Sequence, residues 1–200
     1  MNIAECLVHV LNAMQPFARS SPSKRLGGSL KRSSFNNWAW RSAITAATVV
    51  VAVGVVQSPA HASVAQGSVY GSGTITDDWG DEGPLSTTKN RHNSVVGLWQ
   101  GVLIADGYLP QSGFDCDFGP NTRAATIAWQ SDRGLKADGE VGPQTFGRAD
   151  NNLFWYGTSI RYNGSNSDLG SMYRDSAGRW YVAGSSSIAY LSYTDDSLCG

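Results

Sequence analysis

One short pattern occurs twice in this 200-residue sequence, and it constrains the fold more than any other feature. Residues 115–122 read DCDFGPNT, and residues 138–145, 23 positions later, read DGEVGPQT. Both copies contain an Asp, an acidic residue two places on, an apolar residue and then Gly-Pro-x-Thr. An Asp side chain can accept N–H bonds within a turn, and proline suits the first position of a helix. The repeat therefore predicts two similar turns, each leading into a helix.

Three helices are expected around these turns. Apolar residues at steps of three and four predict a first helix over 93–107, capped by Asn93 or Ser94 and ended by Gly107. The Gly-Pro pairs predict a second helix over 119–134 and a short third helix over 142–149. The residues expected to face the core are Val96, Trp99, Leu103, Thr122, Ala125, Ala128, Trp129, Phe146 and Ala149.

Four dipeptides accompany the two turns: Trp99-Gln100, Gly107-Tyr108, Trp129-Gln130 and Gly134-Leu135. With these in place, residues 93–150 resemble the small peptidoglycan-binding domain found in many secreted bacterial cell-wall proteins. The family usually has Leu or Phe where Trp stands here, and it has Gly at the position of Cys116. The resemblance implies a mainly α, three-helix bundle. It also implies peptidoglycan as the partner, through the glycan strand, the stem peptide or both, and no cofactor.

The resemblance also implies where a ligand would bind. Backbone N–H groups near the Gly-Pro turns can receive a peptide carboxylate at a helix N-terminus. The residues assigned to ligand binding in this way are Phe118, Gly119, Gln100, Gln130, Asp138, Gly139, Val141, Gly142 and Thr145. The competing interpretation is that Asp138 and the glycines only form the turns.

Residues 1–62 have the composition of a bacterial secretory leader. Six Lys or Arg and one acid precede an uncharged stretch at 43–56, and the small residues Ala60 and Ala62 follow on either side of His61. Basic, apolar and small-x-small segments in this order are typical of a signal peptide, and the apolar stretch is shorter than the roughly 20 residues that span a bilayer. We predict a signal peptide cut between Ala62 and Ser63, and a secreted or cell-wall-associated product that is free of the membrane. An uncut membrane anchor is the alternative.

Two cysteines, Cys116 and Cys199, remain once the leader is removed. Exported proteins commonly pair such cysteines. A bridge closing a loop of about 80 residues is worth roughly 4 kcal/mol in the chain-entropy model. We predict this disulfide, and two free thiols are the alternative.

The segments on either side of the helices differ from them in character. Residues 63–92 are rich in Gly, Ser, Thr and Asp without an apolar period, which predicts a flexible linker. Residues 151–200 contain aromatic or alternating runs at 153–162, 173–182 and 187–193, which predict three or four short antiparallel strands leaning on the helices. The expected fold is therefore α+β, with the helical domain at 93–150 followed by a β meander.

The chain offers few residues for catalysis. One histidine, His92, follows the leader and cannot supply a zinc site, and Cys199 has no histidine base nearby. Carboxylate pairs for a glycosidase exist among 15 acids, but Glu82 and Glu140 lie in turn or linker sequence. A net charge of −1 also argues against a strongly basic nucleic-acid binder. We predict no enzyme, no metal and no cofactor.

Together these features predict a secreted, monomeric protein that binds peptidoglycan without cleaving it. Two alternatives stay open: a small hydrolase with its active site in residues 151–200, and a protein-interaction or inhibitor module on the same fold. The aromatic residues Trp155, Trp180, Tyr181 and Tyr190 form either a sugar-stacking face or simply one side of a small sheet.

Overall fold

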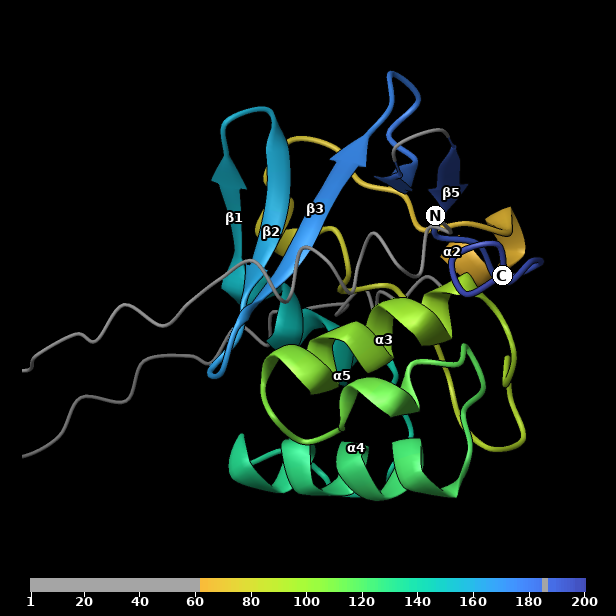
Figure 1. Ribbon diagram of the computed structural model, residues 1–200, viewed down its shortest axis with the longest axis vertical. Coiled ribbons are helices and arrows are strands. Elements are labelled where there is room, and N and C mark those ends of the chain that lie inside the picture. The colour runs from red at the N-terminus through yellow and green to blue at the C-terminus, as the bar shows by residue number, and fades with distance from the viewer. Residues whose placement is uncertain (1–61, 185–186) are drawn as a thin grey trace, which may run out of the picture. The chain divides into compact units, whose positions relative to one another are not determined.

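The computed structural model describes residues 62–184 and 187–200, which have an α+β architecture (Figure 1). The helices are α2 (Ala62–Gln66), α3 (Ser94–Ala105), α4 (Pro120–Asp132) and α5 (Pro143–Ala149), with short 3-10 turns η1 (Ile75–Asp77), η2 (Gln111–Gly113) and η3 (Asp150–Asn152). The strands are β1 (Leu153–Tyr156), β2 (Ser159–Asn163), β3 (Asp168–Arg174), β4 (Trp180–Ala183) and β5 (Ile188–Tyr190). Residues 1–61 of the predicted leader lie outside the described residues. The predicted cut would fall between Ala62, which is the first residue of α2, and Ser63.

Helix α3 begins and ends where the sequence predicts. The Asn93 side chain accepts N–H bonds from Val95 and Val96, each at 3.0 Å, and so caps the first turn. Gly107, with φ +82°, adopts the left-handed conformation just after the helix ends. Both signals lie within a few residues of the helix ends, which is why they could be identified from the sequence.

The two Gly-Pro pairs also start helices as predicted. Gly119 and Gly142 are extended N-cap residues, and the prolines that follow occupy the first helical positions of α4 and α5. One predicted core residue of α4 is wrong, because Ala128 is exposed and Thr126 is buried instead. Thr126 accepts a bond from Trp99 Nε1 at 2.9 Å, so a polar partner determines which residues of α4 face the core.

The C-terminal residues form one antiparallel meander in the order β1-β2-β3-β4-β5. The meander has five strands, whereas three or four were predicted. The additional strand arises because the chain turns at Gly157, with φ +62°, so that residues 153–162 form two paired strands instead of one. The pairs Ile160–Met172 and Met172–Val182 show that these buried residues share one face of the sheet, and Trp180 lies on it too. Trp180 is therefore a core residue and not part of an exposed sugar-stacking face.

Helix α3 lies between this sheet and α4, and all twelve of its residues are buried (Figure 1). A helix covered on all sides needs small residues where its neighbours approach most closely. A Cβ atom on Gly101 would come within 2.8 Å of the Leu169 side chain on β3. At Gly97, a Cβ atom would lie 2.6 Å from the sulfur of Cys116. These two glycines allow the sheet and the disulfide to pack against α3.

The segment before α3 differs from the predicted flexible linker. Val69, Trp79 and Leu85 are fully buried in the same core as the helices. The Val69 backbone bonds to Trp180 and Leu191, and the backbone of Leu85 exchanges two bonds of 2.9 Å with Val141. The sequence of this segment shows no regular spacing of apolar residues, because its buried residues are single side chains separated by polar turns. Its Gly- and Ser-rich composition therefore gave the wrong expectation.

The predicted disulfide is confirmed. Cys116 and Cys199 are bonded, with their Cα atoms 5.9 Å apart and 83 positions apart in sequence. The bond ties the last turn of the chain to the loop before α4. Since the sheet precedes Cys199, the bond also closes the β extension onto the helical part.

Candidate functional site

The first repeated turn is organised by the buried side chain of Gln100 on α3. Its Oε1 atom accepts the N–H groups of Asp115 and Cys116 at 3.0 and 2.9 Å. Its Nε2 atom donates to Asp115 Oδ1, to the Asp117 carbonyl and to Thr122 Oγ1, at 2.6, 3.0 and 3.1 Å. The amide is saturated by internal partners, so its role here is to hold the turn against the helix.

The second turn repeats this arrangement around Gln130 on α4. Its Oε1 atom accepts the Gly139 N–H at 2.9 Å, while Nε2 donates to the Glu140 carbonyl at 2.8 Å and to Thr145 Oγ1 at 3.0 Å. These three partners lie 23 positions after three of the partners of Gln100, namely Cys116, Asp117 and Thr122. Both glutamines were predicted ligand residues, and the structure places both inside the protein as clamps on the turns.

An open pocket of about 380 Å³ lies against the second turn. Four of the nine predicted ligand residues line it: Gln130, Asp138, Gly142 and Thr145. The other lining residues, which the sequence did not indicate, are Leu135, Lys136, Glu140, Pro143 and Gln144. The Gly134-Leu135 dipeptide could have indicated Leu135 as a lining residue, because Gly134 is left-handed and ends α4 next to the pocket.

The remaining predicted ligand residues lie elsewhere. Gly139 and Val141 belong to the second turn, but their N–H groups are directed inward, to Gln130 Oε1 and the Leu85 carbonyl. Phe118 is fully buried, and it lies with Gly119 and Gln100 at the first turn. The structure therefore brings part of the predicted set together at one turn and separates it from the rest.

Charges of both signs surround the pocket. Asp138 lies 3.2 Å from Lys136, and Glu140 lies 3.0 Å from Lys89, both in exposed ion pairs. Burial acts to raise the pKa of Asp138, but bonds from the Glu140 N–H, Lys136 and Gln130 outweigh it, and the pKa lies below its usual value. At the start of α5, the Gln144 N–H lies in the first turn, where a helix provides no internal acceptor. The pocket can therefore contact carboxylate and ammonium groups at once.

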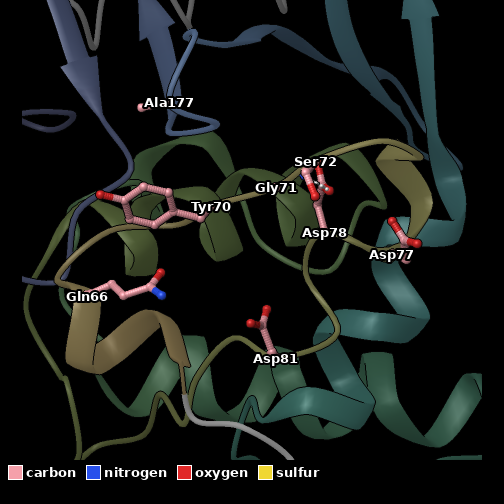
Figure 2. Close-up of a pocket in the computed structure, with 8 residues that line it drawn as sticks. All are labelled: Gln66, Tyr70, Gly71, Ser72, Asp77, Asp78, Asp81 and Ala177. Carbon is pink, nitrogen blue, oxygen red and sulfur yellow. Dashed lines mark hydrogen bonds between the residues drawn. The ribbon is translucent and has the colours of Figure 1, made fainter.

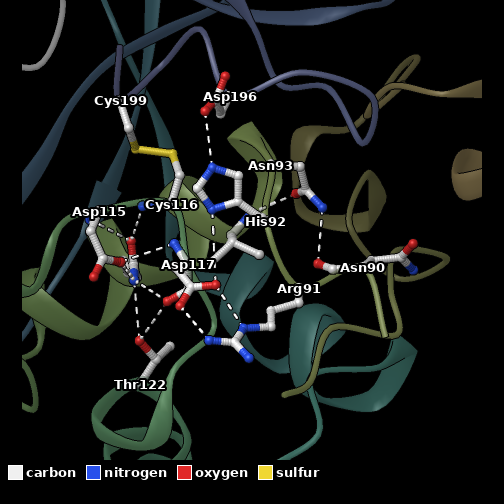
Figure 3. A network of polar contacts seen from close by, with 12 residues as sticks. Asn90, Arg91, His92, Asn93, Asp115, Cys116, Asp117, Thr122, Asp196 and Cys199 are labelled. Atoms are coloured by element: carbon white, nitrogen blue, oxygen red, sulfur yellow. Dashed lines mark hydrogen bonds and ion pairs between the residues drawn. A yellow bond between two sulfur atoms is a disulfide. The ribbon is translucent and has the colours of Figure 1, made fainter. Parts of the chain in front are cut away.

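The first turn is covered by other residues at the equivalent place (Figure 3). Arg91 forms two bonds of 2.8 Å to the carboxylate of Asp117, which hold the pKa of that carboxyl below its usual value. The exposed His92 lies 3.0 Å from Asp196, and Cys116 carries the disulfide. His92 lies at the end of the predicted linker, and its exposed side chain contacts the C-terminal segment.

A second pocket, of about 450 Å³, is lined by three carboxylates that the sequence analysis did not single out (Figure 2). Its lining residues are Gln66, Tyr70, Gly71, Ser72, Asp77, Asp78, Asp81 and Ala177. Asp78 is buried and lies 2.9 Å from Arg174. Burial raises the pKa of Asp78 to about 6, against the opposing effect of Arg174.

Two further carboxyls are buried close to this region, around Trp79. Asp150 accepts the Trp79 N–H at 3.3 Å, and burial raises its pKa to about 7. Glu82, which was expected in turn or linker sequence, is fully buried and accepts a 2.5 Å bond from the Tyr193 hydroxyl. The expectation failed because Glu82 lies in the segment that packs into the core. Among the described residues, no group of three or more His, Cys, Asp or Glu side chains is arranged to hold a metal.

A third, polar pocket of about 470 Å³ lies where α3 ends and the sheet begins. Its buried member, Asp106, accepts bonds from Trp129 Nε1, Arg133 Nη2 and the Tyr162 hydroxyl at 2.7, 2.7 and 2.6 Å. The Ser165 N–H bonds to its other oxygen at 2.8 Å. One carboxylate thus joins the end of α3 to both α4 and the sheet.

Comparison with known proteins assigns the helical part to a class. Residues 92–148 match the family described as "Putative peptidoglycan binding domain", so the chain carries a module of this kind. The matched range contains both repeated turns and the pocket at the second turn.

One curated relative can also be named. The chain is 40% identical over 65 residues to "Uncharacterized protein FadG" of Bacillus subtilis (strain 168), a match that covers 32% of this chain and 11% of that protein. The chain thus spans only a small part of the relative's length. No solved structure matches the chain significantly. None of the helices in the described ranges has the length and apolar character that a membrane span requires.

Proposed function

We propose that this protein is a secreted, non-catalytic component of the bacterial cell wall that binds peptidoglycan. Its three helices α3, α4 and α5 would form the small bundle of the binding domain, bounded at 93–150. The observation that carries the proposal is the coincidence of the matched family range with an open pocket at the second Gly-Pro turn. The domain division at 63, 93 and 151 and a monomeric state are part of the same proposal.

The pocket suits a short peptide better than a flat sugar surface. Leu135 and Pro143 offer apolar contact to a ligand in the pocket. Lys136 is suited to a carboxylate and Asp138 to an ammonium group, provided that the ligand replaces the exposed ion pair that the two form with each other. A peptidoglycan stem peptide carries groups of all three kinds. The pocket is therefore proposed to receive the stem peptide.

The electrostatics of the pocket favour binding over catalysis. A general acid at neutral pH needs a carboxyl whose pKa is raised toward 7. Asp138 has a lowered pKa, and both it and Glu140 are paired with lysines at exposed positions. These properties suit recognition of a charged ligand and do not suit proton transfer.

The repeat supplies a matched control for a binding experiment. Gln144 in the second turn corresponds to Asn121 in the first, and both side chains are exposed. Sedimentation with insoluble peptidoglycan is expected to retain the wild-type protein and Asn121→Trp equally. Gln144→Trp, which places a bulky uncharged side chain at the pocket, is expected to lower the affinity at least tenfold. Equal retention of both variants, or no retention of the wild type above a control protein, would refute the proposal.

A hydrolase is the second candidate, with its site at the acidic pocket, which is lined mainly by residues 66–81 and not, as the sequence suggested, by residues 151–200. The raised pKa of Asp78 and the neighbouring Asp81, whose pKa burial also raises, are features that a glycosidase uses. However, Asp78 is engaged by Arg174, by Trp180 Nε1 at 3.1 Å and by the Ser72 N–H at 3.0 Å. Release of soluble muropeptides by the wild type, abolished in Asp81→Asn, would establish this activity in place of the non-catalytic role.

A further inference from the structure

The outer face of the sheet carries aromatic side chains that do not belong to the core. Tyr173 pairs with Tyr181, and Tyr181 pairs with Tyr190, so the three side chains point to the same side of β3, β4 and β5. Phe154 pairs with Arg161 on β1 and β2. Because Ile160, Met172 and Val182 occupy the buried face, all five of these residues lie on the opposite face.

The three tyrosines form a continuous row across the strands. The ring centres of Tyr173 and Tyr181 are 5.4 Å apart with planes only 21° from parallel, and those of Tyr181 and Tyr190 are 5.8 Å apart at 60°. All three side chains are partly exposed. Arg179 lies 4.3 Å above the Tyr190 ring and donates to its hydroxyl at 3.2 Å. The row is thus held in place by contacts within the protein, so little ordering is needed before a ligand stacks on it.

An uncompensated charge lies beside this row. The guanidinium of Arg161 is 3.8 Å above the ring of Tyr156, which is 57% exposed. In the part of the chain that the structure describes, Arg161 has no carboxylate partner, and its Nε atom is buried without a hydrogen bond. Arg174 and Arg179, by contrast, are paired with Asp78 and Asp175. The outer face therefore offers aromatic surface together with one arginine available to an anion.

We propose that this face is a second wall-binding site, which stacks the sugar rings of the glycan strand on Tyr173, Tyr181 and Tyr190 and pairs Arg161 with a carboxylate of the polymer. The ligand identity rests on the proposed function, but the site is distinct from the stem-peptide pocket. The apolar C–H faces of pyranose rings fit flat aromatic rings, and tyrosine hydroxyls can bond to sugar hydroxyls. The planar guanidinium of an arginine that stacks on an aromatic ring also matches the geometry of a carboxylate.

The composition of the face favours a glycan over a second copy of the chain. Permanent dimer interfaces are large and more apolar than the rest of the protein surface. Here the central row consists of tyrosines, and Ile188 is the exposed large aliphatic residue of the face. A second copy would also present another uncompensated Arg161 where a carboxylate is needed. Charge complementarity therefore favours an anionic, ring-bearing polymer.

The test uses peptide-free glycan strands, prepared by amidase digestion of peptidoglycan, and the full-length secreted protein. Such strands carry the free lactyl carboxylate of muramic acid, whereas oligomers of N-acetylglucosamine carry no carboxylate. The wild type is expected to bind both. Tyr181→Ser is expected to lower both affinities about five- to tenfold, and Tyr181→Phe is expected to retain them within about twofold. Arg161→Gln is expected to weaken binding to the strands and to leave binding to the oligomers unchanged.

A second variant separates loss of the site from loss of the fold. Tyr156→Ser removes an exposed ring under Arg161, and circular dichroism is expected to show an unchanged structure while binding to the strands falls. Absence of wild-type binding to both glycans, or unchanged binding in folded Tyr181→Ser, would overturn the proposal. A dimer that dissociates in Tyr181→Ser without any glycan binding would overturn it as well. Retention on intact peptidoglycan in those cases would leave the stem-peptide function standing.

Discussion

Removal of the disulfide should destabilise the protein by an amount that the sequence separation predicts. Cys116 and Cys199 close a loop of 83 positions, and the chain-entropy model assigns such a bond about 4.5 kcal/mol of stability. The proposed variant replaces both cysteines by serine. Its free energy of unfolding is expected to be lower by about 3 to 5 kcal/mol, which is a large part of the stability of a small domain.

The backbone at Cys116 provides an internal check on this reasoning. Its φ of +55° lies in the left-handed region, which costs a residue with a Cβ atom roughly 1 kcal/mol relative to glycine. The second turn has Gly139, with φ +73°, at the equivalent position. Cys116→Gly with Cys199→Ser is therefore expected to recover about 1 kcal/mol relative to the double serine variant.

Equilibrium unfolding in urea, followed by fluorescence, measures both effects. Trp79, Trp99, Trp129 and Trp180 are fully buried, so their emission is expected to change on unfolding. The matched control is the wild type with its disulfide reduced, which should unfold close to the double serine variant. If both double variants unfold at the same urea concentration as the oxidised wild type, the disulfide does not constrain the unfolded chain as argued.

Three further changes test the buried groups. Burial raises the pKa of Asp150 to about 7, so the folded state favours the protonated carboxyl, and the protein loses stability as the pH rises from about 4 to 7. Asp150→Asn is expected to have the same free energy of unfolding as the wild type at pH 4. At pH 8 its free energy of unfolding is expected to be higher than that of the wild type by roughly 2 to 4 kcal/mol. Asp106→Asn leaves the half-buried Arg133 without its carboxylate, and urea unfolding is expected to show a loss of about 3 kcal/mol. Gly97→Ala places a methyl group 2.6 Å from the sulfur of Cys116, and a thermal melt is expected to show a loss of about 2 kcal/mol; an unchanged melting temperature would contradict the close packing described.

The helical part could be predicted from the sequence because its signals are local. The Asn93 cap, the Gly107 stop and the two Gly-Pro starts each act within a few residues, and each determines a helix end. The β meander was foreseen for the same reason, since alternation and turn residues are visible along the chain. The local sequence could not show that α3 is covered on two sides. One of these sides is covered by the sheet, which begins 48 positions after the helix ends.

The residues before α3 show the limit of composition as evidence. Gly- and Ser-rich sequence usually cannot bury enough apolar surface to become ordered. Here a single residue of the segment, Trp79, packs against both Phe146 and Trp180, with ring centres 6.4 and 5.5 Å away. The buried Asp78, Glu82 and Asp150 were missed with it, because their burial depends on partners far along the chain. A few large side chains can order a segment that its average composition describes as mobile.

The two repeated turns have the same internal frame but different surroundings. Gln100 and Gln130 hold the turns with equivalent bonds, so the frame itself leaves the outer surface free for other use. At the first turn, that surface is taken by Arg91 and by the disulfide at Cys116, which attach neighbouring segments of the same chain. At the second turn, Gly139 replaces the cysteine and the surface stays open as a pocket. The duplication thus separates two tasks: one turn attaches the β extension, and the other remains available for a ligand from outside.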